Sequence, residues 1–226
     1  LTARLEDRRD RREAAVTAYE QAIGLRPTWA TPYRELAALH ERSGEADAAL
    51  AVLEAGAAAG AASTDLRLRQ AFLLQRTGMM RRAIALYEEL LDAGVDSDVV
   101  VNNYAALVAD FATDDQAAVE RALALARRFA TSDEAYFVDT LGWLHYRLDR
   151  PAEALAFLRR AAAMAPDDPQ IRYHLAAALH AADDAEGALA ELDRAVVEGA
   201  AYPGVDAARA LQATLKAERQ AQATSE

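Results

Sequence analysis

The residues best suited to metal binding or acid–base chemistry are four histidines, His40, His145, His174 and His180. Imidazole ligates metals and titrates near neutral pH. A helical zinc motif places two histidines four residues apart on one face, whereas His174 and His180 are six residues apart and do not share a face. We therefore expect the four side chains to be packed or solvated, and the sequence predicts no metal site.

Two short segments are the remaining candidates for chemistry. The run 56–60 contains two glycines but lacks the preceding strand and the Lys or Ser of a phosphate-binding loop, which indicates a helix end and turn. The run 4–12 alternates arginines with acidic residues, which predicts a solvated helix and turn rather than a nucleic-acid patch. With no paired carboxylates or activated nucleophile either, the sequence predicts a chain that is not an enzyme and has no cofactor.

Charge and composition narrow the partners further. The formal net charge of -11 opposes binding to nucleic acid and to anionic lipid, since both depend on Lys and Arg contacts to phosphate. No window approaches the roughly 18 consecutive apolar residues of a membrane span, so we expect no direct membrane insertion of this segment. The absence of cysteine fits a reducing or an oxidising compartment equally well.

The elements that position these residues are predicted to be helices repeated with a 34-residue period. Ala, Leu, Arg and Glu dominate, and these side chains lose little freedom in a helix. Small and apolar residues recur at positions 4, 7, 8, 11, 20, 24, 27 and 32 of each unit, as in the unit that contains Val138, Gly142 and Ala154. The predicted units are a partial repeat at 1–29 and repeats at 30–63, 64–97, 98–134, 135–168 and 169–202.

Two further sequence features recur from unit to unit. A turn residue recurs five residues before position 20, as Gly44, Gly78, Asp149 and Asp183, because Gly and Asp tolerate the backbone geometry that ends a helix. Position 8 is always small, which lets the two helices of a hairpin approach closely; the five examples are Ala37, Ala71, Ala105, Gly142 and Ala176.

The repeat at 98–134 is irregular. Ala105 and Ala122 are 17 residues apart where other units show 12, so we expect residues 112–117 to carry about five extra residues in the inter-helix turn. After residue 202 we expect a capping helix over 203–222, which would cover the stacking face of the last repeat, followed by a tail at 223–226. The truncated unit at the start suggests further repeats before Leu1.

This pattern resembles the tetratricopeptide repeat (TPR) family over residues 1–222. The resemblance implies an all-α, right-handed superhelical solenoid of antiparallel helix hairpins. A narrower likeness, carried by Asn102-Asn103-Tyr104-Ala105 and by the segment from Val138 to Arg147, is to bacterial TPR lipoproteins of exopolysaccharide and PEP-CTERM systems. That likeness implies a periplasmic or outer-membrane-associated location and a scaffold for polysaccharide synthesis or export.

In the TPR family the first helix of each hairpin lines a concave groove, into which positions 2, 5, 6, 9, 12 and 13 point. Applying that register predicts the partner-binding residues Arg69, Phe72, Arg76, Asn102, Asn103, Tyr136, Asp139, Trp143, Tyr146, Tyr173 and His174.

Two sets of these predicted binding residues also have an alternative interpretation. The aromatic set Tyr136, Trp143, Tyr146 and Tyr173 would form binding anchors on one wall, or its members would fill the space between hairpins. Asn102 and Asn103, with Arg69 and Arg76, would clamp a peptide carboxylate, or the asparagines would satisfy backbone groups between hairpins.

The sequence thus predicts a non-catalytic scaffold that binds a peptide or partner protein in its groove. The competing hypothesis is a self-assembling module that forms homo-oligomers.

Overall fold

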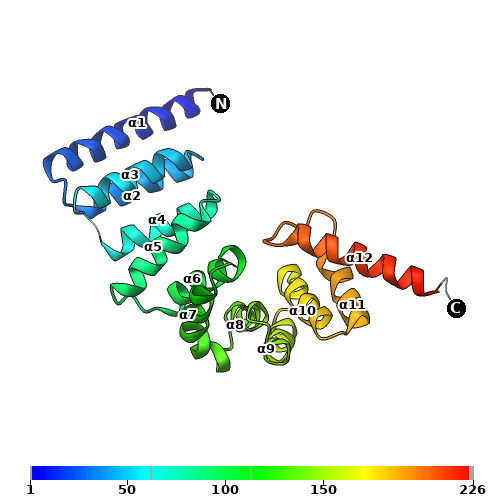
Figure 1. Ribbon diagram of the computed structural model, residues 1–226. Coiled ribbons are helices and arrows are strands. Elements are labelled where there is room, and N and C mark those ends of the chain that lie inside the picture. The colour runs from blue at the N-terminus through cyan, green and yellow to red at the C-terminus, as the bar shows by residue number, and fades with distance from the viewer. Residues whose placement is uncertain (1, 62, 113, 224–226) are drawn as a thin grey trace. The chain divides into compact units, whose positions relative to one another are not determined.

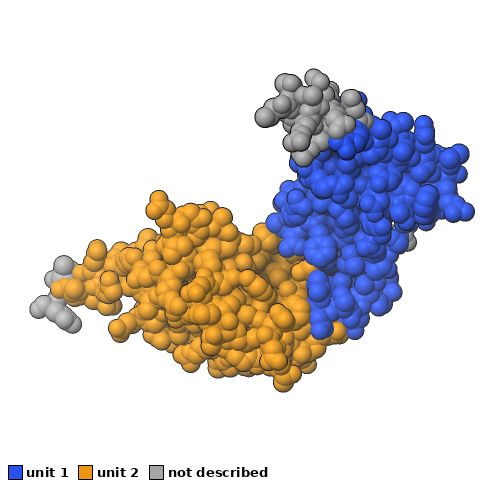
Figure 2. Space-filling model, turned by 180° about the vertical axis from the view of Figure 1, so that it is seen from behind, with its two compact units in different colours: residues 1–100 blue, residues 101–226 orange. Residues whose placement is uncertain are grey.

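The computed structural model describes residues 2–61, 63–112 and 114–223, with side chains from residue 11 onward. The chain divides into two compact units, Leu1–Val100 and Val101–Glu226 (Figure 2). All regular elements of the described ranges are helices, so the predicted all-α class of hairpin repeats is confirmed (Figure 1). None of the described helices is both long and apolar enough to cross a bilayer.

The first unit contains a single helix followed by two hairpins. The single helix is α1 (Thr2–Leu25); the hairpins are α2 (Ala30–Arg42) with α3 (Ala46–Ala58), and α4 (Thr64–Arg76) with α5 (Met80–Asp92). Their cores follow the repeat, because Ala37, Ala49, Leu53, Ala71 and Ala83 are all fully buried. Helix α6 (Asp98–Phe111) begins in the last residues of this unit and continues into the second.

Helix α1 differs from the predicted helix and turn in the run 4–12. It continues unbroken from Thr2 to Leu25, so no turn separates the arginine-rich run from the second-helix pattern of Ala15 and Tyr19. The run has no Gly or Pro, and its alternating charges are compatible with a helix, which explains why the turn is absent. The side chains of residues 4–10 lie outside the described residues, whereas Arg12 forms an ion pair with Glu45.

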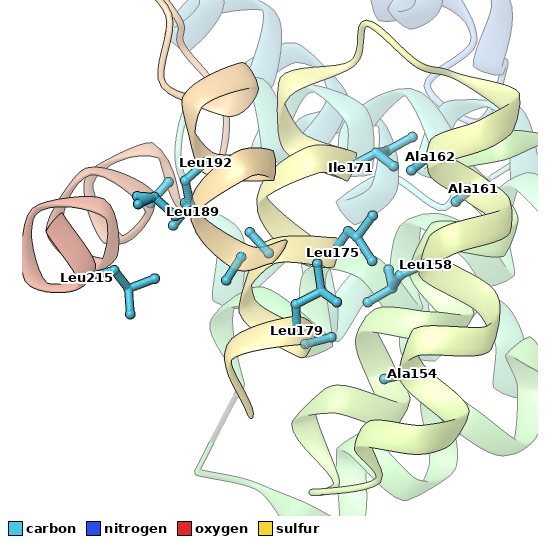
Figure 3. Close-up of a cluster of buried hydrophobic side chains, with 14 of the residues drawn as sticks. Ala154, Leu158, Ala161, Ala162, Ile171, Leu175, Leu179, Leu189, Leu192 and Leu215 are labelled. Carbon is cyan, nitrogen blue, oxygen red and sulfur yellow. The ribbon is translucent and has the colours of Figure 1, made fainter. Parts of the chain in front are cut away.

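The second unit stacks three hairpins and a terminal helix. After α6 come α7 (Gln116–Ala126) and the 3₁₀ turn η1 (Arg127–Thr131), then α8 (Ala135–Arg147) with α9 (Pro151–Met164) and α10 (Pro169–Ala181) with α11 (Ala185–Ala195). The terminal helix is α12 (Val205–Ala223), and residues 224–226 of the predicted tail lie outside the described residues. Leu215 of α12 joins the apolar core that Leu158, Leu175 and Leu192 build (Figure 3).

The turns between paired helices have the geometry that the repeat predicted. Gly44 and Gly78 adopt φ of 76° and 79°, and Asp149 and Asp183 adopt φ of 55° and 61°. This left-handed conformation disfavours most side chains but tolerates Gly and, less readily, Asp. The prediction that these four residues end the first helix of their hairpins is therefore confirmed.

The irregular hairpin distributes its extra residues differently from the prediction. Helix α6 ends at Phe111 and α7 begins at Gln116, which leaves one residue more between them than between α8 and α9. Helix α6 has 14 residues where α8 has 13, and Ala122 is the seventh residue of α7 where Ala154 is the fourth of α9. Of the five extra residues between Ala105 and Ala122, four are therefore helical, one at the end of α6 and three at the start of α7, because helical residues satisfy their backbone hydrogen bonds within the helix.

Candidate binding surface

The centre of the second unit is an aromatic stack that joins α8 to α10. The indole of Trp143 lies 4.5 Å from the ring of Tyr146, with an interplanar angle of 6°, and 4.1 Å from the ring of His174, with an angle of 8°. Tyr146 follows Trp143 by one helical turn, whereas His174 comes from the next hairpin. The order of the stack is thus Tyr146, Trp143, His174.

Two aspartates anchor this stack through hydrogen bonds. Trp143 Nε1 donates to Asp110 Oδ1 of α6 over 2.8 Å. His174 Nδ1 lies 3.0 Å and 2.9 Å from the two carboxylate oxygens of Asp139 on α8. Three successive first helices, α6, α8 and α10, are therefore connected through one polar and aromatic cluster.

The electrostatics of the cluster reflect its burial. Burial raises the pKa of the Asp110 carboxyl, against the opposing effects of His174 and the Trp143 hydrogen bond. Burial on its own lowers the pKa of His174, but Asp139, Asp110 and Asp168 outweigh it, so the pKa of His174 is raised. Burial also raises the pKa of the Tyr173 hydroxyl to about 12, which keeps that phenol neutral.

Three of the predicted binding residues are interior residues instead. Trp143 and Asp139 are each 5% exposed, and His174 is 2% exposed. Almost no part of these side chains is accessible to a partner, so the geometry does not support the prediction that they contact it directly. For Trp143, the structure favours the alternative that the ring fills the space between hairpins, because α10 packs its own ring residues over the groove position of α8.

The accessible end of the stack is Tyr146, which lines a pocket. Tyr146 and Tyr173 are half-buried, and the rings of Tyr173 and Trp143 lie 5.8 Å apart. The pocket, of about 240 Å³, is lined by Tyr146, Arg147, Asp149, Pro151 and Ala181. We call it the α8–α10 pocket. Its lining combines the outer ring of the stack with an arginine whose guanidinium lies 5.7 Å from the Trp143 ring centre.

Tyr136 is the most exposed member of the predicted aromatic set, with 58% of its surface accessible. Its hydroxyl donates to Asp168 Oδ2 over 2.9 Å. Asp168 also caps α10, because its other oxygen accepts from the backbone N–H groups of Gln170 and Ile171. Tyr136 therefore lies beside the start of α10, whereas Tyr146 and the pocket lie by its end.

The predicted residues of the first unit form a separate group on α4. Arg69 Nε lies 2.7 Å from one carboxylate oxygen of Glu41, and Arg76 Nη1 lies 3.1 Å from the other. Both arginines are thus paired with a carboxylate of their own chain, and neither is a vacant cation for a peptide terminus. Phe72, on the same helix, is 42% exposed and makes an edge contact with Tyr87 at 6.3 Å.

The asparagines of the predicted clamp lie in α6 and are half-buried. The side-chain oxygen of Asn102 is inaccessible to solvent and has no hydrogen-bond partner. A buried acceptor that contacts neither solvent nor a donor cannot reach a peptide, so the geometry does not support the clamp at Asn102.

The register did not identify two arginines that hold successive hairpins together. Arg172, 6% exposed, donates to the Pro166 carbonyl over 2.9 Å and 2.7 Å and pairs with Glu191 at 2.8 Å. Arg160 donates to the carbonyls of Ala130 and Ser132 at the end of η1. For Arg172 a signal was present, because an arginine stands at position 4 of its unit, where Val138 and Tyr33 are buried apolar residues.

The histidines take four different environments. His174 belongs to the buried stack, and His180 is exposed on the same helix. His40 Nδ1 lies 2.7 Å from Glu45 Oε2, and the His145 ring packs 5.6 Å from Phe157. Among the described residues no group of three or more His, Cys, Asp or Glu side chains is placed to hold a metal ion.

Comparison with known proteins supports a single repeat architecture. Residues 146–215 match the tetratricopeptide repeat family model. No curated protein matches the chain by sequence. Several solved structures are similar to it in fold despite low sequence identity.

The first is YrrB, described as a TPR protein with an unusual peptide-binding site; it is 18% identical, with a TM-score of 0.60 over 79% of this chain and 91% of YrrB. MamA from Desulfovibrio magneticus RS-1 is 17% identical, with a TM-score of 0.61 over 74% of this chain and 92% of MamA. TTC0263, a thermophilic TPR protein in Thermus thermophilus, is 18% identical, with a TM-score of 0.57 over 82% of this chain and 98% of TTC0263.

Identities at this level establish the fold and nothing about ligands. The hairpin geometry, the left-handed turn residues and these likenesses agree with one another. The chain therefore has the tetratricopeptide repeat fold, and its residues 146–215 carry the sequence signature of that family.

Proposed function

We propose that the chain is a non-catalytic scaffold that binds a peptide or a partner protein on the first helices of its hairpins. One observation carries this proposal: a buried, hydrogen-bonded stack ends in the half-exposed ring of Tyr146 at the α8–α10 pocket. A ring that is already fixed loses little entropy on binding, and fixed aromatic residues beside an arginine are enriched where binding energy concentrates. Stacked hairpins provide the extended surface around such an anchor.

The pocket can be tested by filling it. Peptides enriched from a random phage-display library on the whole chain would be titrated against Ala181→Gln, which places a longer side chain at the pocket rim and leaves every residue of the stack unsubstituted. Ala182→Gln is the matched control, since Ala182 is the adjacent exposed residue and does not line the pocket. We expect Ala181→Gln to weaken binding about tenfold, which corresponds to roughly 1.4 kcal/mol.

Equal affinity for both variants would place the peptide elsewhere. Failure to enrich any peptide that binds the wild-type chain would contradict the proposal itself. Circular dichroism of each variant verifies that the helices are intact, which separates loss of the pocket from loss of the fold.

Self-assembly is the competing proposal, and exposed apolar residues of the first unit favour it. Leu25 at the end of α1 is 88% exposed, and Trp29 just before α2 is 45% exposed. Large apolar side chains at one turn suit a contact between copies. Light scattering at two concentrations, with Trp29→Ser as the variant, distinguishes the two: a mass that rises with concentration only for the wild type supports self-assembly.

The exopolysaccharide setting stays a prediction from the likeness of residues 102–105 and 138–147, most of which the segment Asp139 to Trp143 carries. Each distinctive residue of that segment has a structural role, because Asp139 pairs with His174, Gly142 contacts Leu158 and Trp143 joins the stack. The segment therefore supports hairpin packing more directly than a pathway. Identification of the partner in cells that make the full protein is the measurement that decides it.

A further inference from the structure

The buried pair of His174 and Asp139 lies at the inner end of the stack and does not line the α8–α10 pocket. Both side chains are almost fully buried, and His174 Nδ1 reaches both carboxylate oxygens of Asp139 within 3.0 Å. The other ring nitrogen, Nε2, is inaccessible to solvent and has no hydrogen-bond partner. Burying two ionisable groups is costly unless they stabilise one another, so their protonation states should affect the stability of the surrounding helices.

We propose that protonation of His174 stabilises the packing of α6, α8 and α10, the first helices of the three hairpins in the second unit, and that loss of the proton weakens this packing. A protonated imidazole attracts the Asp139 carboxylate on α8 and interacts favourably with the electron-rich face of Trp143, whose ring centre is 4.1 Å away. Trp143 in turn donates to Asp110 on α6. The single proton therefore stabilises contacts among three hairpins.

The charged groups around His174 favour its protonated form. Asp110 faces it from α6, Asp139 faces it from α8, and Asp168 stands just before α10. Arg147 of α8 adds one positive charge over the Trp143 ring. Burial disfavours the imidazolium, but the three carboxylates outweigh burial, in keeping with the raised pKa of His174.

The direction of the pH dependence follows from the raised pKa of His174. A histidine whose pKa is higher in the folded chain contributes stability that is complete below its unfolded pKa, for which the ordinary value is 6.5. This contribution is lost as pH rises through the folded pKa. The raised carboxyl pKa of Asp110 has the same sign, but its contribution is complete only below the ordinary carboxyl value of 3.8, so it belongs to a more acid range than that of His174. The neutral ring still donates from Nδ1 to Asp139, so the change is a graded loosening and not a collapse.

A histidine titration followed by NMR tests the proton directly on the intact chain. The ring ¹³C and ¹⁵N signals of His174 would be recorded from pH 5 to pH 9, with the exposed His180 of the same helix as the internal reference. We expect His174 to keep its proton at pH values above 6.5, the ordinary histidine pKa. A His174 signal that is neutral throughout, or that titrates below the ordinary histidine pKa of 6.5, overturns the proposal.

Unfolding at two pH values tests the consequence. The wild-type melting temperature is expected to be about 2–4 °C lower at pH 8.5 than at pH 6. A shift of this size corresponds to a modest decrease in the free energy of unfolding for a chain of this length. His180→Gln should show the same fall, whereas His174→Gln should show a much smaller one. An equal decrease in melting temperature for all three proteins contradicts the proposal. If His174→Gln does not fold, Asp139→Asn replaces it, and the NMR titration stands without any variant.

Discussion

Phe72 and Trp143 occupy position 9 of the first helix in their respective repeats, yet they have different surroundings. Phe72 is 42% exposed and makes its ring contact with Tyr87 of its own hairpin. Trp143 is 5% exposed and is covered by His174 and Tyr173 of the following hairpin. The register therefore determines the direction of a side chain, whereas the residues of the next hairpin determine its burial.

The neighbouring position 8 shows a second difference between the same two hairpins. Ala71 fits there with no exposed surface in the hairpin of α4 and α5. In the hairpin of α8 and α9 the residue is Gly142, and a Cβ built on it would lie 2.7 Å from Leu158 Cγ and 3.1 Å from Leu158 N. The hairpin of α8 and α9 therefore has no room for a methyl group at position 8, whereas the hairpin of α4 and α5 accommodates one.

The largest expected effect comes from Trp143→Ala. The substitution removes a buried ring from between Tyr146 and His174 and leaves Asp110 without its indole donor. We expect a loss of about 3–5 kcal/mol in the free energy of unfolding, as for other buried aromatic residues. Urea denaturation followed by circular dichroism measures it. A loss below about 1 kcal/mol would mean that Trp143 resembles Phe72 after all.

A smaller effect is expected from Gly142→Ala. The new methyl group would press on Leu158, which is fully buried and close on its backbone side as well. Overpacking of this kind costs about 1–3 kcal/mol, and the better helix propensity of alanine offsets about 1 kcal/mol of it. We expect a net loss of roughly 1 kcal/mol by the same denaturation experiment. A gain in stability would show that α8 and α9 separate easily.

The smallest expected effect on stability is that of Phe72→Ala. Its ring is already partly in water, so truncation should cost about 1 kcal/mol or less. If α4 binds partners, the same change should weaken peptide binding more than it weakens the fold. Differential scanning calorimetry with a matched binding titration separates the two readouts, and a stability loss comparable to that of Trp143→Ala would refute the comparison.

The sequence determined the hairpins, their turns and the fully buried small residues, because these depend on local periodicity. Gly44 and Asp149 could be identified as turn residues from spacing alone, and both adopt positive φ. Helices of 13 residues with apolar positions at fixed spacing must bury the same stripe wherever they occur.

Tertiary structure decided which of the predicted binding residues can meet a partner. Whether Trp143 was an anchor or a core residue depended on His174, which lies 31 residues further along and packs on it only after two hairpins have stacked. Arg69 and Arg76 were positioned correctly on α4, but their pairing with Glu41 could not be read from the repeat, because Glu41 belongs to another hairpin. Periodicity specifies a face of one helix, whereas burial and charge pairing are properties of several helices packed together.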